Sequence, residues 1–148
     1  MRIEDSCEEN IVSRTTLTEM ADEEATIEYT ESSFHCHEFN HTILSTEVKF
    51  EVLQMKDSTF VWIGNMLDPK FSDLSLAIKT PSNPIPIATK ILGAATADTT
   101  SLGLAERLSK KLKKPVYISF NISIINNKML EDIERRLVEE IEINAEKF

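Results

Sequence analysis

The 148-residue sequence has few cysteines and glycines and no long hydrophobic run, and each shortage excludes a class of protein. The two cysteines, Cys7 and Cys36, cannot build a disulfide framework, and no CxxC pair indicates a zinc or redox site. The three glycines provide few of the tight loops that active sites favour. No segment approaches the ~18 to 20 apolar residues of a membrane span, and no signal peptide is recognisable. We therefore expect a soluble intracellular protein with no membrane contact.

Basic residues are fewer than acidic residues, and most of the acidic excess lies in the first 33 residues. The sequence has 25 acidic and 16 basic residues and a net charge of -9, which argues against binding of a polyanion as its main task. Residues 1–33 hold ten acids and two bases, a net of -8, whereas residues 34–148 hold 15 acids and 14 bases, a net of -1. The first segment is also rich in Ser and Thr and has no sustained hydrophobic period. We predict a disordered acidic tail at 1–33 and a folded domain at 34–148.

Beyond residue 34, short apolar segments predict five or six β-strands. Val48, Phe50 and Val52 alternate with charged residues, and residues 59–63 follow a turn at 56–58, which together indicate a hairpin. Prolines at 84 and 86 place one of the remaining strands at a sheet edge or at a strand start. Those remaining strands are expected at residues 34–43, 74–78, 85–91 and 116–124.

Two segments with apolar residues at helical spacing predict helices, from about residue 100 to 113 and from about 128 to 145. Asp98 or Thr99 is expected to cap the first helix, and Pro115 follows its end. The fold class is therefore α+β, with a mostly antiparallel sheet of about five or six strands and two main helices.

The strand predicted at residues 59–63 is apolar on both of its faces. Phe60 and Trp62 point to one side, and Val61 and Ile63 point to the other. Two helices can shield one face of such a sheet but hardly both. The pattern therefore favours cover of the second face by another polypeptide.

Candidate chemical sites are weak. His35, Cys36, His37 and His41 lack a second ligand cluster elsewhere in the chain, so a polar strand face is favoured over a metal site. The segment 93–101 lies between a strand and a helix, but it lacks the second glycine and the lysine of a phosphate loop, which favours a capped helix start. No nucleophile elbow is present. We expect no catalytic residue, no metal, no cofactor and no enzymatic activity.

Two charged stretches are candidate docking surfaces. The basic stretch at 107–114 is either a solvated helix face or a patch for an acidic protein surface, and a nucleic-acid-binding domain is a further alternative, although no aromatics are interleaved with the bases. The acidic stretch at 139–146 is either a solvated helix face or a contact for a basic partner.

Several short segments, taken in order, resemble the proteasome assembly chaperone 4 family. The similarity covers about residues 37–148 and excludes the acidic tail, and its most specific parts are residues 60–64 and 92–108. The other matching segments are residues 56–58, 86–89, 116–121 and 146–148.

The resemblance implies a non-enzymatic chaperone of the 20S proteasome in the cytoplasm and in the nucleus. It implies a heterodimer with proteasome assembly chaperone 3, whose sheet packs on that of this chain, and binding of α-subunits near α5 during α-ring assembly. The expected partner-chaperone interface is formed by Phe60, Val61, Trp62 and Ile63. The expected α-subunit docking residues are Arg107, Lys110, Lys111, Lys114, Glu139 and Glu142. A small homodimeric scaffold unrelated to proteasomes is an alternative that would also explain Trp62.

Overall fold

A computed structural model of the chain describes residues 27–93, 99–123 and 126–148. The chain divides into two units, Met1–Ser33 and Phe34–Phe148. The expected disordered tail lies outside the described residues except for residues 27–33. Within the described parts of the chain, no helix has both the length and the apolar character that a membrane crossing requires.

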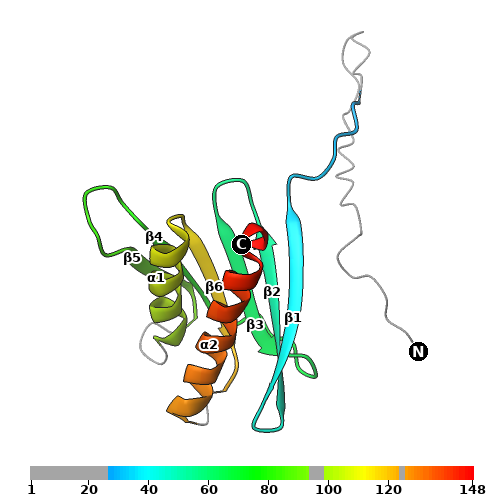
Figure 1. Cartoon of the computed structure of the whole chain (residues 1–148), viewed down its shortest axis with the longest axis vertical. Coiled ribbons are helices and arrows are strands. Elements are labelled where there is room, and N and C mark those ends of the chain that lie inside the picture. Colours follow the sequence, from blue (N-terminus) through cyan, green and yellow to red (C-terminus); the bar gives the residue numbers. More distant parts are fainter. Residues whose placement is uncertain (1–26, 94–98, 124–125) are drawn as a thin grey trace. The chain divides into compact units, whose positions relative to one another are not determined.

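The second unit contains one six-stranded sheet, two α-helices and a short 3-10 helix, which confirms the expected α+β class (Figure 1). The strands lie in the order β1-β2-β3-β6-β4-β5. Every neighbouring pair is antiparallel except β3 and β6, which are parallel. The elements are β1 (His35–Ile43), β2 (Thr46–Gln54), β3 (Thr59–Asn65), β4 (Leu74–Ile78), β5 (Ile87–Leu92), α1 (Thr100–Leu112), β6 (Val116–Asn121), α2 (Asn127–Ile143) and η1 (Ala145–Lys147).

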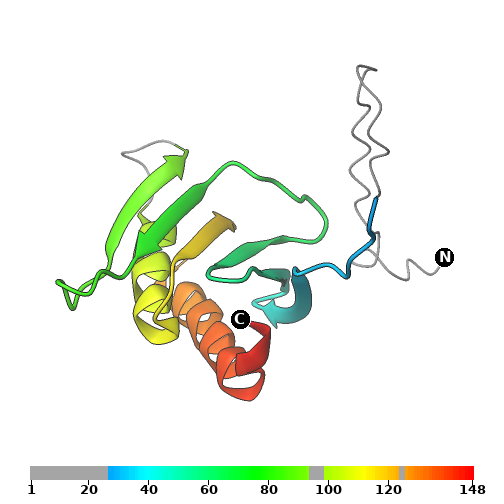
Figure 2. The same ribbon diagram turned by 90° about the horizontal axis from the view of Figure 1, so that it is seen from above.

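Both helices lie on the same side of the curved sheet (Figure 2). Helix α1 packs on β4, β5 and β6, and α2 reaches β1. The core between the layers contains Phe50, Val61 and Ile63 from the strands, with Leu104 and Ile133 from the helices. Among the described residues no helix covers the opposite side of this sheet, so for this part of the chain the expectation that two helices shield only one face is confirmed.

The residues of the turn between β1 and β2 do not predict a turn. Leu44 and Ser45 have φ angles of 46° and 66°, values at which Gly and Asn are the usual residues. A Leu-Ser pair gives no hairpin signal, so the pairing of β1 with β2 could not be read from the turn. The predicted hairpin of β2 and β3 is confirmed, and the Met55 main-chain N–H donates to Ser58 O at 3.0 Å across its turn.

The helix bounds lie within two residues of those expected. Thr99 holds the N-cap position of α1 but makes no side-chain cap bond, and Asp98 lies outside the described residues, as does most of the 93–101 segment. The chain leaves α1 through Lys113 at φ 59°, whose N–H donates to Ser109 O at 2.9 Å. At the start of α2 the Asn126 side chain accepts a hydrogen bond from Met129 N at 2.9 Å, which satisfies one of the free N–H groups.

Candidate functional site

The side of the sheet without helices is the main candidate for a binding surface, and we call it the open face. Residues opposite one another in neighbouring strands point to the same side of a sheet. One such row crosses five strands, and four of its five members are apolar or aromatic. The row is Leu53, Phe60, Tyr117, Leu76 and Thr89. An antiparallel sheet that faces water normally carries polar side chains there, so this row points to a buried surface in a complex.

The apolar surface continues onto the β4–β5 hairpin. Ile78 lies opposite Ile87, and the two residues are 41% and 59% exposed. Both share the side of the sheet on which Leu76 and Thr89 lie, because strand residues two positions apart point the same way. The hairpin therefore widens the open face toward the edge of the sheet.

Charged residues border the open face at β1 and β2. Lys49 Nζ lies 2.6 Å from a Glu51 carboxylate oxygen and 3.0 Å from one of Glu38, and Glu38 lies opposite Glu51. Burial alone would lower the pKa of Lys49, but hydrogen bonds to Glu51 and Glu38 and their charges raise it instead. An apolar centre with a satisfied polar border is the usual anatomy of a protein interface.

Trp62 is covered by the chain itself. Its Nε1 donates to the main-chain oxygen of Lys70 at 2.8 Å, and only 9% of the residue is exposed. The loop after β3 thus folds over the indole ring, and Phe71 lies beside Phe60 with ring centroids 6.2 Å apart. Of the expected interface residues, Phe60 is half-buried on the open face, whereas Trp62 supports the loop from beneath.

Val61 and Ile63 are core residues. Both have no exposed surface, because they alternate with Phe60 and Trp62 and point toward the helices. The expectation that they contact a partner is therefore corrected: in this fold the helix layer covers them. The apolar side chains of Leu76 and Tyr117 lie on the open face instead, and they come from strands that sequence reasoning did not connect with β3.

Gly64 makes room for the Trp62 ring, and a Gly64→Ala variant is expected to unfold more easily. A Cβ atom at this position would lie 2.1 Å from Trp62 Cζ2 and Cη2, so the ring must leave its place beneath the loop. We expect a loss of about 1–3 kcal/mol in unfolding free energy. The loss is measured by urea denaturation, and because Trp62 is the single tryptophan, its fluorescence should shift to the red in the folded protein.

Gly103→Ala is the matched control, since its Cβ would meet the mobile end of Arg107 at 3.1 Å. That variant should be as stable as the parent or slightly more stable, with unshifted emission. A Gly64→Ala protein with unchanged emission and unchanged stability would show that Trp62 does not occupy this position.

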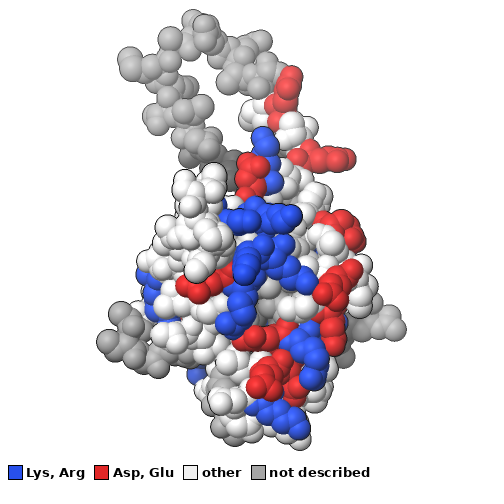
Figure 3. Space-filling view, turned by 60° about the vertical axis from the view of Figure 1, so that its left-hand side comes forward, with Lys and Arg blue, Asp and Glu red and all other residues white. Residues whose placement is uncertain are grey.

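Three of the six expected α-subunit docking residues are engaged in ion pairs between the two helices. Arg107 forms an ion pair with Glu134, and Lys111 Nζ lies 2.9 Å from a Glu142 carboxylate oxygen. Acidic and basic side chains accordingly lie interleaved on this side of the molecule (Figure 3). The basic and the acidic stretch are thus not two separate surfaces of opposite sign.

The remaining docking candidates differ in their surroundings. Lys114 Nζ donates to the main-chain oxygen of Phe148 at 2.6 Å, and burial lowers the pKa of this lysine. Glu139 lies 3.8 Å from the Arg135 guanidinium on the same helix. Lys110 is exposed, and no ion pair is found for it within the described parts of the chain.

His37 of the histidine segment belongs to a partly buried polar cluster around Glu140. His37 Nε2 lies 2.7 Å from Glu140 Oε1, which also accepts from Asn144 Nδ2 at 2.7 Å, while Arg136 donates to Glu140 Oε2 at 2.6 Å. Burial alone would raise the pKa of Glu140, but hydrogen bonds from His37, Arg136 and Asn144 and the Arg136 charge bring it below the ordinary value. Among residues 27–93, 99–123 and 126–148, no group of three or more His, Cys, Asp or Glu side chains is arranged to hold a metal ion.

Comparison with known proteins gives consistent results. The sequence profile described as "Proteasome assembly chaperone 4" matches residues 47–122. Mouse proteasome assembly chaperone 4 is 38% identical over 112 residues, which cover 76% of this chain and 89% of the mouse protein. The human protein of that name is 37% identical over 112 residues, with the same coverage.

The fold is shared with a solved structure. A chain in the crystal structure of a novel chaperone complex for yeast 20S proteasome assembly superposes with a TM-score of 0.58 and covers 76% of this chain and 98% of that chain. At 12% sequence identity this likeness establishes the fold alone. The profile match and the mouse and human relatives establish more: the chain belongs to the proteasome assembly chaperone 4 family.

Proposed function

We propose that this protein is a non-enzymatic chaperone that promotes assembly of the α-ring of the 20S proteasome as a heterodimer with proteasome assembly chaperone 3. The observation that carries the proposal is the apolar row of the open face, which the chain's own helices leave uncovered. The mouse and human relatives bear the name of a proteasome assembly chaperone, and the solved yeast chain with this fold comes from a chaperone complex.

The open face suits a partner with a sheet of its own. Two sheets pack about 10 Å apart with interdigitating side chains, and a specific interface buries about 800 Å² on each partner. Leu53, Phe60, Tyr117 and Leu76 form the centre of such a contact, and the Lys49 ion pairs form part of its border. Burial of apolar area at about 25 cal/mol per Å² is the driving force, offset by the loss of translational freedom.

An assembly chaperone must release the α-subunits. The surface that binds them must therefore bind more weakly than the open face binds the partner chaperone. We propose that subunits near α5 dock on the polar side of the molecule, away from the open face, so that both partners bind at once. No chemical step is needed for this task, because positioning two proteins relative to each other is a matter of binding alone. The cytoplasm and the nucleus are the proposed locations.

Affinity purification tests this function. The full chain, tagged and expressed in cells of its own organism, should co-purify with proteasome assembly chaperone 3 in equal amounts and with 20S α-subunits in smaller amounts. Mass spectrometry identifies the partners, and light scattering gives the stoichiometry of the purified pair. Recovery of a homodimer without either partner would favour the scaffold alternative and contradict the proposal.

A further inference from the structure

Five exposed lysines differ from most of the other basic residues of the folded unit. Seven described lysines and arginines form ion pairs within the chain, and Lys114 donates to the main-chain oxygen of Phe148. For the five exposed lysines, no ion-pair partner is found among the described residues, and Lys128 at the start of α2 is the only other described base in that condition. The five are Lys56, Lys79, Lys110, Lys113 and Lys147.

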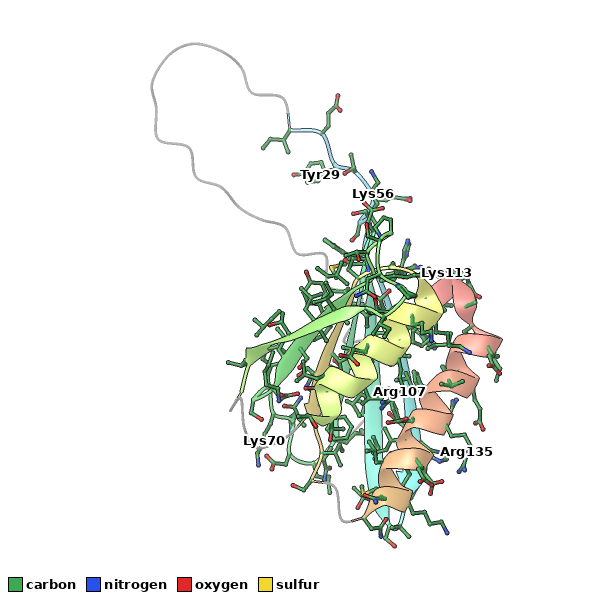
Figure 4. The ribbon with its side chains drawn as sticks, turned by 90° about the vertical axis from the view of Figure 1, so that its left-hand side faces the viewer. Tyr29, Lys56, Lys70, Arg107, Lys113 and Arg135 are labelled. Carbon is green, nitrogen blue, oxygen red and sulfur yellow. The ribbon has the colours of Figure 1, made fainter. Side chains whose placement is uncertain are left out.

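These five lysines lie at one end of the folded unit Phe34–Phe148, which we call the lysine end. They come from the β2–β3 turn, the β4–β5 turn, the last turn of α1 with the residue after it, and η1. Figure 4 shows Lys56 and Lys113 at this end, with Arg107 and Arg135 further along the helices. Segments that are far apart in the sequence thus bring like charges together.

Contacts between the turns fix this arrangement. The Thr59 N–H donates to Pro115 O at 3.1 Å and joins the β2–β3 turn to the turn after α1. Ala77 lies opposite Val116, so the β4–β5 turn starts next to the same place. Gln54 Nε2 donates to the main-chain oxygens of Glu146 and Phe148 at 2.9 and 3.0 Å, which anchors η1 beside the end of β2.

We infer that the lysine end is a docking site for an acidic segment of a partner protein. Asp57 and Glu146 are the exposed acids in these turns, so five lysines against two acids leave a local net charge of +3 on a protein of net charge -9. Like charges held together by the fold repel one another, and an acidic partner relieves that repulsion while the local potential steers its approach.

A protein partner explains the surface better than a nucleic acid does. Arginine is the residue that binds phosphate in a bidentate manner, but all five residues of the lysine end are lysines. The described arginines are engaged in ion pairs within the chain. The described turns of the lysine end expose no aromatic side chain for stacking on bases, since Phe148 is buried. Exposed lysine–carboxylate contacts are individually weak and salt-sensitive, as a chaperone that must release its client requires.

The inference rests on the proposed function in one respect: the acidic segment is taken to belong to an α-subunit. It extends that function by assigning the docking surface to residues that the helix-based expectation missed, since only Lys110 is common to both sets. Arg107, Lys111 and Glu142 are engaged in ion pairs between the helices and are not part of the proposed site.

The test uses fluorescence anisotropy with a labelled 20-residue polyglutamate peptide as the probe and the full chain in complex with proteasome assembly chaperone 3. The variant is Lys56→Gln with Lys79→Gln and Lys113→Gln. The matched control is Lys70→Gln with Lys128→Gln and Arg135→Gln, which lowers the net charge by the same amount at other places on the surface. The parent complex should bind the peptide at about 50 mM salt and lose most of that binding at about 300 mM.

The lysine-end variant should bind the peptide about tenfold more weakly than the parent, and the control should bind within about twofold of it. Equal losses in both variants would show that total charge alone is responsible and would overturn the inference. Absence of binding by the parent at low salt would also overturn the inference. Tighter binding of a 20-nucleotide single-stranded DNA than of the peptide would overturn it as well. Formation of the heterodimer is measured first for the parent and for both variants. A failure to form the heterodimer would contradict the proposed function and is thereby distinguished from a failure to bind the peptide.

Discussion

A Glu140→Ala variant is expected to lose about 2–4 kcal/mol of unfolding free energy, because truncation of this buried carboxylate leaves the partly buried Arg136 and His37 side chains without their partner. Glu140 is 5% exposed and holds His37 of β1, Arg136 of α2 and Asn144 at the end of α2. Within the described part of the chain, Arg136 would then retain its position over the Phe39 ring, 4.9 Å from the centroid, but no ion-pair partner. Urea denaturation at neutral pH measures the loss.

Glu139→Ala is the matched control. Glu139 is the adjacent residue on α2, its side chain is 52% exposed, and its single ion pair to Arg135 spans 3.8 Å. Its removal should change the unfolding free energy by less than about 0.5 kcal/mol. Equal stabilities of the two variants would mean that the Glu140 cluster does not hold α2 against β1.

The same cluster predicts a dependence of stability on pH. The pKa of Glu140 in the folded state lies below its ordinary value of 4.5, so the folded state binds the proton less readily than the unfolded state. Its contribution to stability is therefore fully present above the unfolded-state pKa and is lost as the pH falls through the folded-state pKa. As the pH falls from about 6 to about 3, the difference in unfolding free energy between the parent and a Glu140→Gln variant should shrink. A difference that stays constant over this range would contradict the assigned hydrogen bonds.

A Leu76→Asp variant is expected to bind proteasome assembly chaperone 3 at least about 100-fold more weakly than the parent, since an unpaired charge would be buried in an apolar contact. Leu76 lies between Tyr117 and Thr89 on the open face, so the change leaves the helix-side core untouched. Titration calorimetry with the purified partner measures the affinity, and circular dichroism verifies the fold.

Ile143→Asp provides the comparison, because Ile143 is 73% exposed at the end of α2, on the helix side of the sheet. That variant should bind within about twofold of the parent, as surface changes outside an interface do. Loss of binding by Ile143→Asp with normal binding by Leu76→Asp would place the partner on the helix side instead.

Local patterns predicted the secondary structure well, because the physical signals for it are local. Alternation of Val48, Phe50 and Val52 reflects one buried strand face, and the prolines at 84 and 86 precede an edge strand, as expected. Pro115 follows the end of α1 as expected from its backbone geometry, whereas Thr99 occupies the N-cap position without a side-chain cap bond. The prediction of only two helices also indicated correctly that helices shield one face of the sheet in the described part of the chain.

The candidate site depended on long-range pairing, which no local pattern reports. The parallel pairing of β3 with β6 places Tyr117 beside Phe60, and β4 then brings Leu76 into the same row. The cover over Trp62 depends on a hydrogen bond to Lys70, in a loop whose path the sequence does not indicate. Glu140 was grouped with solvated acids, although its spacing of three and seven residues from Leu137 and Ile133 placed it near the buried stripe of α2.

Hydroxyl-radical footprinting of the full chain, alone and in complex with proteasome assembly chaperone 3, tests the central claim most directly, because it reports the solvent exposure of individual side chains. We predict that oxidation of Phe60, Leu76 and Tyr117 falls severalfold in the complex, whereas oxidation of Ile143, which is 73% exposed, is unchanged. Protection of Ile143 together with unchanged oxidation of Phe60, Leu76 and Tyr117 would contradict the assignment of the open face as the partner surface.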